Sequence, residues 1–595
     1  MRLALYVGAL IVVSSATVVA QTVTSEDEYA KRLRSSSAIE PLSNSLAGEE
    51  VSLYTGATAF SVVDAAIPGT NALPVELRRR LVIEDPGVYK GVFGGIGEWS
   101  LDVPYIHGVF AEAQGWKVIG ANPDARCTTQ AMPNTATGGS SPGAYSNLVW
   151  DGYYLNIPGQ GDSELLKNNR NAVPAVEASF PWVTMERHIV GCLASIRNHP
   201  GEGFVVWAPD GTSYTFDYVI SRQASSVSDI SRVRLGFGGG ATFSKIIPRV
   251  HMYMMATKVQ DRFGNTVNYE YVGTELRRIY ASDGREIILN WVSGNLSSAT
   301  ASGRTWSYSY RNGVVPYGTA AALEAVTLPD GSRWRYSIAG ELKKGAIYRD
   351  DGPGPTNLCQ FDVDRAPGTN FTYTVVSPSD AKVDYLFSYS ARSRTRVPTT
   401  CQETVGAPRY PDVNAVFYQW ALVKKTLTGP GLTPMEWTYG YTGIASGTYY
   451  RAPWPKPDFS TIETYIPGGD CVSCAASGVL TVTEPGRIVD YEYGAQYAVN
   501  EGRLLSKTVR QKGTLAVVSK ETYQYLSDSQ ISAQPFADNI GRSLLPIWER
   551  PMAARQRPVV ATYIAEGGVT FSRTINGFDS YVRPLSATQS STPTP

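Results

Sequence analysis

One short motif has the spacing of a nucleophilic serine. Gly139-Ser140-Ser141-Pro142-Gly143 matches the G-x-S-x-G pattern, in which a strand leads into the serine and a helix follows it. Pro142 comes directly after Ser141 and has no backbone N–H, so an oxyanion hole would lack the donor that it needs there. We therefore expect no hydrolase at this position.

The histidines and carboxylates show no pattern that indicates catalysis. His188 and His199 flank a cysteine-containing segment without metal-ligand spacing, and His251 lies in an apolar Met-Tyr strand; the remaining histidine is His107. Several carboxylates fall in Asp-Gly turns, where the side chain binds local backbone, so choosing two of the many carboxylates as a glycosidase acid and base would be arbitrary. We expect structural roles here and predict no catalytic, cofactor-binding or metal-binding residue.

The six cysteines are candidates for three disulfides. Cys359 and Cys401 flank two strand-like stretches, NFTYTVV and KVDYLFSYS, and Cys127 and Cys192 flank the least repetitive segment. This leaves Cys471 and Cys474, whose C-x-x-C spacing fits a redox dithiol, half of a zinc site, or a local disulfide. The motif lies between strand-like segments and no histidine is near it in sequence, which favours the local disulfide.

The elements that would position these residues are short β-hairpins. Residues 261–310 alternate aromatic strands with turns about 20 residues apart, and a fixed period of that size is typical of a repeat architecture. Tyr269 and Tyr271 fall on one face of a strand and Asn268, Glu270 and Val272 on the other. The turns are rich in Gly, Asp and Asn, as tight hairpins require. The repeat-turn residues are Asp261, Gly264, Asn265, Asp283, Gly284, Gly303, Asp330 and Gly331.

This array resembles the YD repeats of RHS-repeat proteins. Their loose pattern is an Asp-x-x-Gly-Asn turn, a Tyr-x-Tyr strand, a Gly-x-Leu turn and an Ile-containing return strand. The best copy here contains Asp261, Gly264, Asn265, Tyr269, Tyr271, Leu276 and Ile279, and degenerate copies occur near Asp210, Tyr336, Tyr493 and Asn500. Residues 51–82 and 98–104 resemble the region that precedes the repeats. The resemblance implies a hairpin strip wound into a curved shell or cocoon.

Parts of full-length RHS proteins have no counterpart in this sequence. The DPxGL-like motif that adjoins the family's self-cleaving aspartyl site is not found, because Asp85-Pro86-Gly87 lies near the wrong end and lacks the Leu. The variable C-terminal toxin is not found either. The chain resembles the N-terminal and shell portion of such a protein.

The first residues and the overall charge suggest the compartment and the partners. Arg2, the apolar run that follows it and Val18-Val19-Ala20 read as a signal peptide cleaved after Ala20, which predicts a secreted, periplasmic or cell-surface protein. Lys plus Arg (53) equals Asp plus Glu (53), so the composition gives no reason to expect nucleic-acid binding. No later apolar run is long enough to cross a bilayer. The partner and the oligomeric state stay open.

The expected organisation is all-β. It comprises a signal peptide (1–20), a polar lead-in with one short helix (21–45), an N-terminal β region (46–118), a loop-rich insertion (119–200), the hairpin array (201–585) and a disordered tail outside the sheet (586–595). We expect a non-catalytic scaffold or shell without cofactors. The alternative is a β-rich carbohydrate-binding or carbohydrate-active protein, since rows of Tyr and Trp can stack on sugars. Aromatic residues buried between strands would favour the shell, and an exposed row beside two close carboxylates would favour the enzyme.

Overall fold

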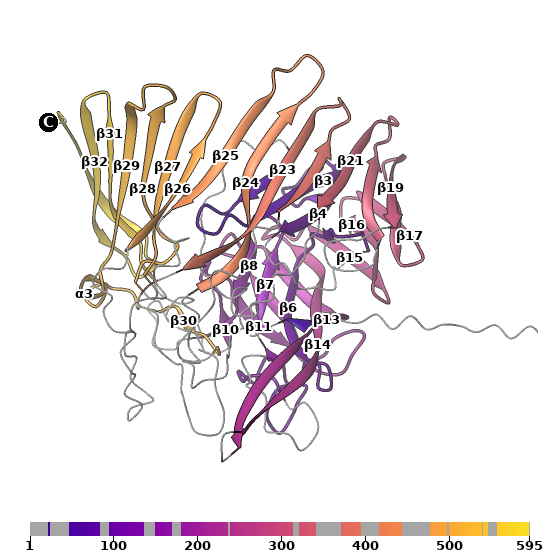
Figure 1. Cartoon of the computed structure of the whole chain (residues 1–595). Coiled ribbons are helices and arrows are strands. Elements are labelled where there is room, and N and C mark those ends of the chain that lie inside the picture. Colours follow the sequence, from indigo (N-terminus) through magenta and orange to yellow (C-terminus); the bar gives the residue numbers. More distant parts are fainter. Residues whose placement is uncertain are drawn as a thin grey trace, which may run out of the picture.

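The protein is built almost entirely of β-strands, which confirms the expected fold class (Figure 1). The computed structural model describes residues 22–23, 47–83, 95–135, 149–150, 152–168, 180–235, 239–312, 321–340, 370–393, 395, 416–442, 476–496, 499–537, 539–545 and 556–593. The expected signal peptide and the helix expected in the lead-in lie outside these residues. Of the lead-in, the short strand β1 (Thr22–Val23) is described, and it pairs with residues 226–227.

Most of the chain forms a serpentine strip that we call the array. Each strand pairs antiparallel with the next strand in it, so hydrogen bonding is largely between sequence neighbours. The strands of the array are β13 (Ser213–Leu235), β14 (Gly239–Gln260), β15 (Thr266–Val272), β16 (Glu275–Ala281), β17 (Glu286–Val292), β18 (Asn295–Ala301), β19 (Arg304–Asn312), β20 (Ala321–Thr327), β21 (Arg333–Gly340), β22 (Asn370–Val376), β23 (Lys382–Ser393), β24 (Val416–Thr428), β25 (Met435–Thr442), β26 (Ser477–Thr483), β27 (Arg487–Gly494), β28 (Leu504–Gln511), β29 (Val517–Tyr525), β31 (Val559–Glu566), β32 (Val569–Phe578) and β33 (Pro584–Pro593).

Asp and Gly shape the tight turns at one rim of the array. These turns join β14 to β15, β16 to β17 and later pairs of strands in the same way. The Asp261 Oδ1 accepts the backbone N–H groups of Phe263 and Asn265, each at 2.9 Å. Gly264 has a φ of 89°, a conformation that a residue with a Cβ adopts only at a cost. These local contacts fix the register of each hairpin, and the register decides which side chains face inward.

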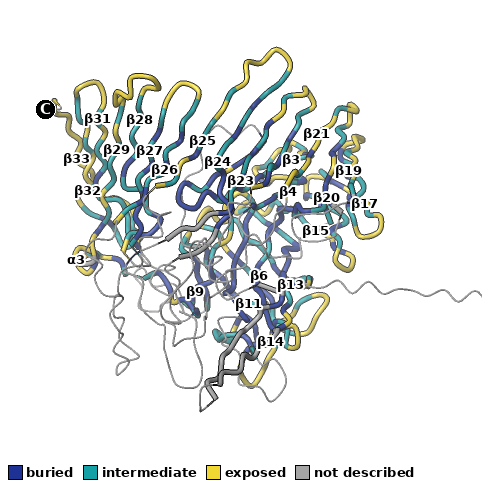
Figure 2. Tube along the Cα trace, viewed as in Figure 1, coloured by how far each residue is buried: buried dark blue, intermediate teal, exposed yellow. Residues whose placement is uncertain are grey.

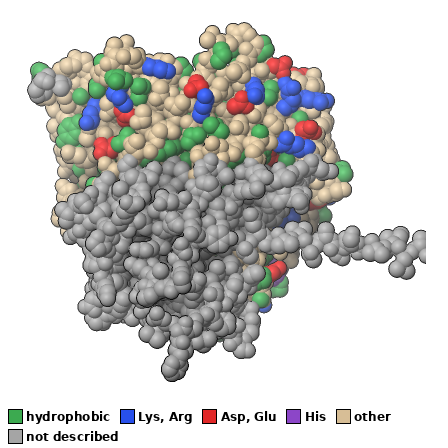
Figure 3. Space-filling model, viewed as in Figure 1, with side chains coloured by type: hydrophobic (Ala, Val, Ile, Leu, Met, Phe, Trp, Pro, Cys, Tyr) green, Lys and Arg blue, Asp and Glu red, His purple; other side chains and the backbone are tan. Residues whose placement is uncertain are grey.

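Burial alternates along the array strands. In β15, Val267 and Tyr271 are buried while Glu270 and Val272 are exposed, so the predicted faces of this strand are confirmed. Figure 2 shows the same change from buried interior to exposed turns along the strands. We call the buried side the inner face. The other side carries cross-strand ion pairs such as Lys424–Glu436, and Figure 3 shows Lys, Arg, Asp and Glu intermixed there.

A second, four-stranded sheet covers the inner face. This inner sheet consists of β2 (Glu49–Val51), β3 (Thr58–Ile67), β4 (Val75–Ile83) and β5 (Ser100–Leu101). Phe60 is fully buried, with its ring 4.9 Å from that of Tyr385 and 5.2 Å from that of Tyr373. Burying a Phe side chain contributes about 1.5–3 kcal/mol, so this contact helps to hold the two sheets together. Strands that bury little as single hairpins thereby share one core.

The segment expected to be a loop-rich insertion contributes strands to a second core. With β6 (Tyr105–Ala111) and β12 (Gly203–Trp207), it forms a lobe whose strands are β7 (Tyr154–Ile157), β8 (Gly161–Glu164), β9 (Leu166–Asn168), β10 (Trp182–Val183) and β11 (Ile189–Leu193). The lobe packs around Trp116, Trp150 and Trp182. Strands of two to five residues are too short to show alternation in a sequence, which explains why the expectation missed them.

The chain between β29 and β31 returns to this lobe. After the one-turn helix α3 (Asp528–Ile531), the strand β30 (Gly541–Arg542) pairs with β9, and Ile540 packs on Leu166 and Val183. Arg187 donates a hydrogen bond to Gln556 at 2.9 Å. The late part of the array is therefore tied to the lobe that precedes it.

The expectation that the tail lies outside the sheet is wrong. β33 runs from Pro584 to Pro593 and pairs with β32 from Phe578 back to Val569. Its Ser- and Thr-rich composition resembles that of disordered segments, but backbone hydrogen bonds to β32 hold it while its side chains stay exposed.

Candidate functional site

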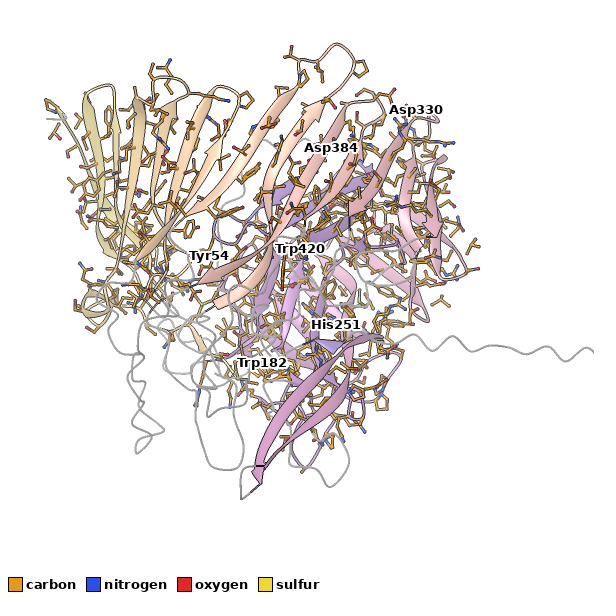
Figure 4. All side chains as sticks on the ribbon, viewed as in Figure 1. Tyr54, Trp182, His251, Asp330, Asp384 and Trp420 are labelled. Carbon is orange, nitrogen blue, oxygen red and sulfur yellow. A yellow bond between two sulfur atoms is a disulfide. The ribbon has the colours of Figure 1, made fainter. Side chains whose placement is uncertain are left out.

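Aromatic residues of the repeats lie in the core between the two sheets, beside a larger number of aliphatic ones. Tyr336, Tyr373, Tyr385 and Trp420 are each at most 4% exposed. In Figure 4 Trp420 and Tyr54 lie near the middle of the molecule, and Asp330 lies at a turn at its edge. Tyr54, next to the inner sheet, donates a hydrogen bond from its hydroxyl to Glu501 at 2.8 Å. These aromatic side chains connect distant parts of the chain.

A buried ion pair lies at the centre of this core. Arg79 Nε is 2.9 Å from Asp64 Oδ2, with side-chain exposures of 0% and 2%. The guanidinium lies 4.2 Å from the ring centre of Trp99 and donates a hydrogen bond to the Tyr336 hydroxyl. The Tyr308 hydroxyl donates to Asp64 at 2.9 Å. Arg79 is thus a core residue, which contacts Asp64 on β3, Tyr336 on β21 and Trp99 next to β5.

Glu98 is a buried carboxyl group without a cation within ion-pair distance among the described contacts. Its Oε2 accepts the Leu323 backbone N–H at 2.8 Å, and its Oε1 has no hydrogen-bond partner. Burial raises the pKa of Glu98 to about 7, against the smaller opposing effect of the backbone donors. A second carboxyl group, Glu49, instead pairs with Lys425 at 3.2 Å, and both are 4% exposed. The inner sheet is thus attached to the array by ionisable groups as well as by apolar ones.

Strand pairing brings together two histidines that are 144 residues apart in sequence. In the antiparallel pairing of β6 with β14, His107 lies opposite Tyr253, and Val109 lies opposite His251. The facing ring nitrogens, His107 Nδ1 and His251 Nε2, are 2.8 Å apart. Figure 4 places His251 in the lower part of the molecule, away from Trp420.

A carboxylate and a phenol extend the histidine pair. His107 Nε2 faces Asp162 Oδ1 at 3.3 Å, and the Tyr253 hydroxyl is 3.0 Å from His251 Nδ1. Asn156 donates to the same Asp162 oxygen at 2.9 Å. We call Asp162, His107, His251 and Tyr253 the histidine cluster. No local sequence pattern indicates this cluster, since neither histidine has a ligand-like neighbour in sequence.

The cluster runs from solvent into the core. The Asp162 side chain is 39% exposed and His107 is 13% exposed, whereas His251 and Tyr253 are each 4% exposed. Desolvation acts to raise the pKa of Asp162, but the charge and hydrogen bond of His107, with Arg80 nearby, outweigh it and hold that pKa well below its ordinary value. Burial raises the pKa of Tyr253 far above its usual range.

The other predicted residues have separate positions. His188 is buried, with its Nδ1 3.1 Å from Thr184 Oγ1, and burial lowers its pKa. His199 lies 3.3 Å from Arg126. The predicted Cys127–Cys192 disulfide is confirmed. Ser140, Ser141, Cys359, Cys401, Cys471 and Cys474 lie outside the described residues.

The repeat-turn residues lie at the rim and not at the histidine cluster. Gly284, Gly303 and Gly331 have φ angles of 87°, 72° and 85°. Asp283 contacts Arg285, whose Nη1 donates to the backbone carbonyls of Ile67 and Leu73 in and beside the inner sheet. One turn of the repeat therefore also helps to fasten the inner sheet.

Within the part of the chain that the structure describes, no group of three or more His, Cys, Asp or Glu side chains is arranged to hold a metal ion. None of the helices described there is long and apolar enough to span a membrane. No protein-family model matches the chain, and no curated protein matches it in sequence.

Proposed function

We propose that this protein is an exported, RHS-like scaffold that acts without catalysis, through its surface or its enclosed volume. It would serve either as a cell-surface interaction protein or as the shell portion of a toxin-delivery protein. The proposal rests on the repeat pattern of the sequence together with one structural observation, which is that the repeat aromatics face the core.

That observation favours a shell over a sugar-binding face. A carbohydrate platform needs aromatic rings exposed in a row, whereas Tyr336, Tyr373 and Trp420 pack between the array and the inner sheet. The exposed large aromatics of the described residues include Trp207, Phe263, Phe571 and Tyr581, which do not follow one another along one strand face. Here the Tyr-x-Tyr pattern stabilises the sheet.

Charge supports protein partners over nucleic acid. The whole chain has a formal net charge of zero, and the outer face combines both signs in pairs such as Arg335–Asp380 and Arg278–Glu286. Nucleic-acid binding depends on an excess of positive charge that neutralises phosphates.

The test is a turnover screen on the purified mature chain with ester, glycoside, peptide and nucleic-acid substrates, together with a glycan array. We expect neither turnover nor glycan binding. Turnover that disappears in Ser141→Ala or His107→Ala, but persists in the surface variant Arg278→Ala, would refute the non-catalytic proposal. N-terminal sequencing of exported protein should begin at Gln21; a retained leader would refute the proposed cleavage site.

A further inference from the structure

We propose that the histidine cluster is an acid-sensitive latch, which holds β6 against β14 while the two imidazole rings carry at most one added proton and releases β6 when both rings are protonated. The inference does not depend on the proposed function. It follows from the order of donors and acceptors along the cluster.

With both rings neutral, the two contacts beyond the carboxylate have matching donors and acceptors. His107 presents Nε2 to Asp162 Oδ1 at 3.3 Å, an ion-pair distance, and accepts at Nδ1 from the Nε2–H of His251. His251 in turn accepts at Nδ1 from the Tyr253 hydroxyl. Each group donates to the next in one direction, toward the carboxylate.

One added proton reverses the His107–His251 and His251–Tyr253 contacts without moving a heavy atom. His107 then donates from both nitrogens, to Asp162 and to His251 Nε2, and His251 donates from Nδ1 to the Tyr253 oxygen. The Asp162 carboxylate balances the new charge. The latch therefore tolerates the first proton.

The second proton has no place in this geometry. Both facing nitrogens, which are 2.8 Å apart, then carry a hydrogen. The two rings become neighbouring cations, and the Asp162 carboxylate is the one negative charge within the cluster that can balance them. The rings must separate, and the β6–β14 pairing from Tyr105–Met255 to Ala111–Arg249 has to give way around them.

The surrounding charges increase this effect. Ionisable groups around the cluster include Arg80 on β4, Asp102 after β5, Tyr105 on β6, Tyr154 on β7 and Arg222 on β13. The buried Arg249 lies two residues before His251 on β14. The three arginines are cations that disfavour a second positive charge. Burial raises the pKa of Asp102 to about 6, so acid also removes a negative charge next to the cluster. The tyrosines stay neutral throughout.

Release of β6 would affect three parts of the molecule. β6 follows the inner sheet directly, pairs with β14 of the array and pairs with β7 of the lobe. Loosening it changes how the inner sheet and the lobe are joined to the array, which is why we expect a localised opening and not a uniform loss of structure.

Hydrogen exchange on the whole chain tests the latch. When the pH is lowered from about 7.5 to about 5, amide exchange in residues 105–111 and 249–255 should accelerate by about tenfold or more, after correction for the pH dependence of the intrinsic exchange rate. A tenfold change corresponds to a difference of about one pKa unit between the closed and the open state. His107→Gln, which cannot become a cation, should abolish the acceleration. His199→Gln, at a histidine outside the cluster, should keep it. Unchanged exchange in the wild-type chain, or equal acceleration in His107→Gln, would overturn the proposal.

A measurement on the wild-type chain keeps the test decisive if His107→Gln does not fold. With ¹⁵N-labelled histidine rings, NMR should show two separate protonation steps for the pair, and the step at lower pH should coincide with the faster exchange of residues 105–111. Protonation of both rings while β6 stays protected would refute the latch.

Discussion

At the scale of single residues, the core between the sheets combines apolar packing with buried ionisable groups. Glu98 is 6% exposed and keeps one carboxylate oxygen without a partner, while Arg79 is neutralised by Asp64 and contacts two aromatic rings. Buried charges are favourable only when they are paired and hydrogen-bonded. At neutral pH ionisation of Glu98 therefore lowers stability, whereas the charge of Arg79 is balanced by Asp64.

Glu98→Gln should stabilise the protein at about pH 8 and have little effect at about pH 4. The amide can still accept the Leu323 N–H but cannot ionise. The folded pKa of about 7 exceeds the ordinary value of 4.5, so the wild type loses stability as pH rises between these values, by at most about 3 kcal/mol. Calorimetry across this pH range measures the difference. Glu436→Gln, at a half-exposed ion pair, is the control, and equal effects of both substitutions would contradict the prediction.

Arg79→Ala should destabilise the protein by about 3–5 kcal/mol, because it leaves Asp64 buried and unpaired. The double variant Arg79→Met with Asp64→Leu should recover most of that loss, since both charges are then removed. Arg278→Ala, at an exposed pair, should cost less than about 1 kcal/mol. Denaturant unfolding compares the variants, and a double variant no more stable than Arg79→Ala would show that the charge itself is not the cause.

At the scale of elements, the hairpins depend on turn geometry and the lobe depends on a covalent link. Gly284 has a φ of 87°, and a Cβ there would meet no atom within 4 Å. The glycine is therefore required by backbone conformation and not by space. Cys127 and Cys192 close a loop of 65 residues that contains several short strands.

Gly284→Val should destabilise the array by about 1–3 kcal/mol, and Gly284→Asn by less, because Asn tolerates positive φ better than a β-branched residue does. Gly486→Ala is the matched control: this turn glycine has equally open surroundings and no positive φ. Thermal unfolding ranks the three variants. If Gly486→Ala costs as much as Gly284→Val, the backbone explanation fails.

Replacing Cys127 and Cys192 together by Ser should destabilise the lobe by about 4 kcal/mol in the chain-entropy model. Peptide mapping without reduction checks the bond, and hydrogen exchange of residues 152–207 checks the location of the effect. The same map tests the Cys359–Cys401 bridge, which remains a prediction. Free thiols at Cys127 or Cys192 in exported protein would contradict the observed pairing.

At the scale of the whole molecule, the structure is a sheet that follows the sequence order, with a smaller sheet against its inner face. The array alone would expose one side of its aromatic residues. Coverage by β2–β5 converts that side into a core, and the return of β30 to β9 ties a late part of the chain to an early part. Stability is therefore shared between segments that are hundreds of residues apart, such as Tyr54 and Glu501.

The sequence by itself determined the local structure. The period-two alternation of Tyr269 and Tyr271 and the Asp and Gly of the turns predicted the hairpins and their buried faces, because strand alternation and positive φ are local properties. The pairing of Cys127 with Cys192 was also within reach of sequence reasoning, from their positions around one segment in a chain that was expected to be exported.

Only the tertiary structure decided what meets across the core. The contacts of Arg79 with Tyr336 and of His107 with His251 depend on how sheets stack and how β6 aligns with β14, and no local pattern encodes such long-range pairings. The tail was misjudged for a related reason: the residues of β33 have little strand preference of their own, and their structure comes from backbone bonds to β32. Residue patterns fix the strands, whereas the distant neighbours of each strand are fixed by packing.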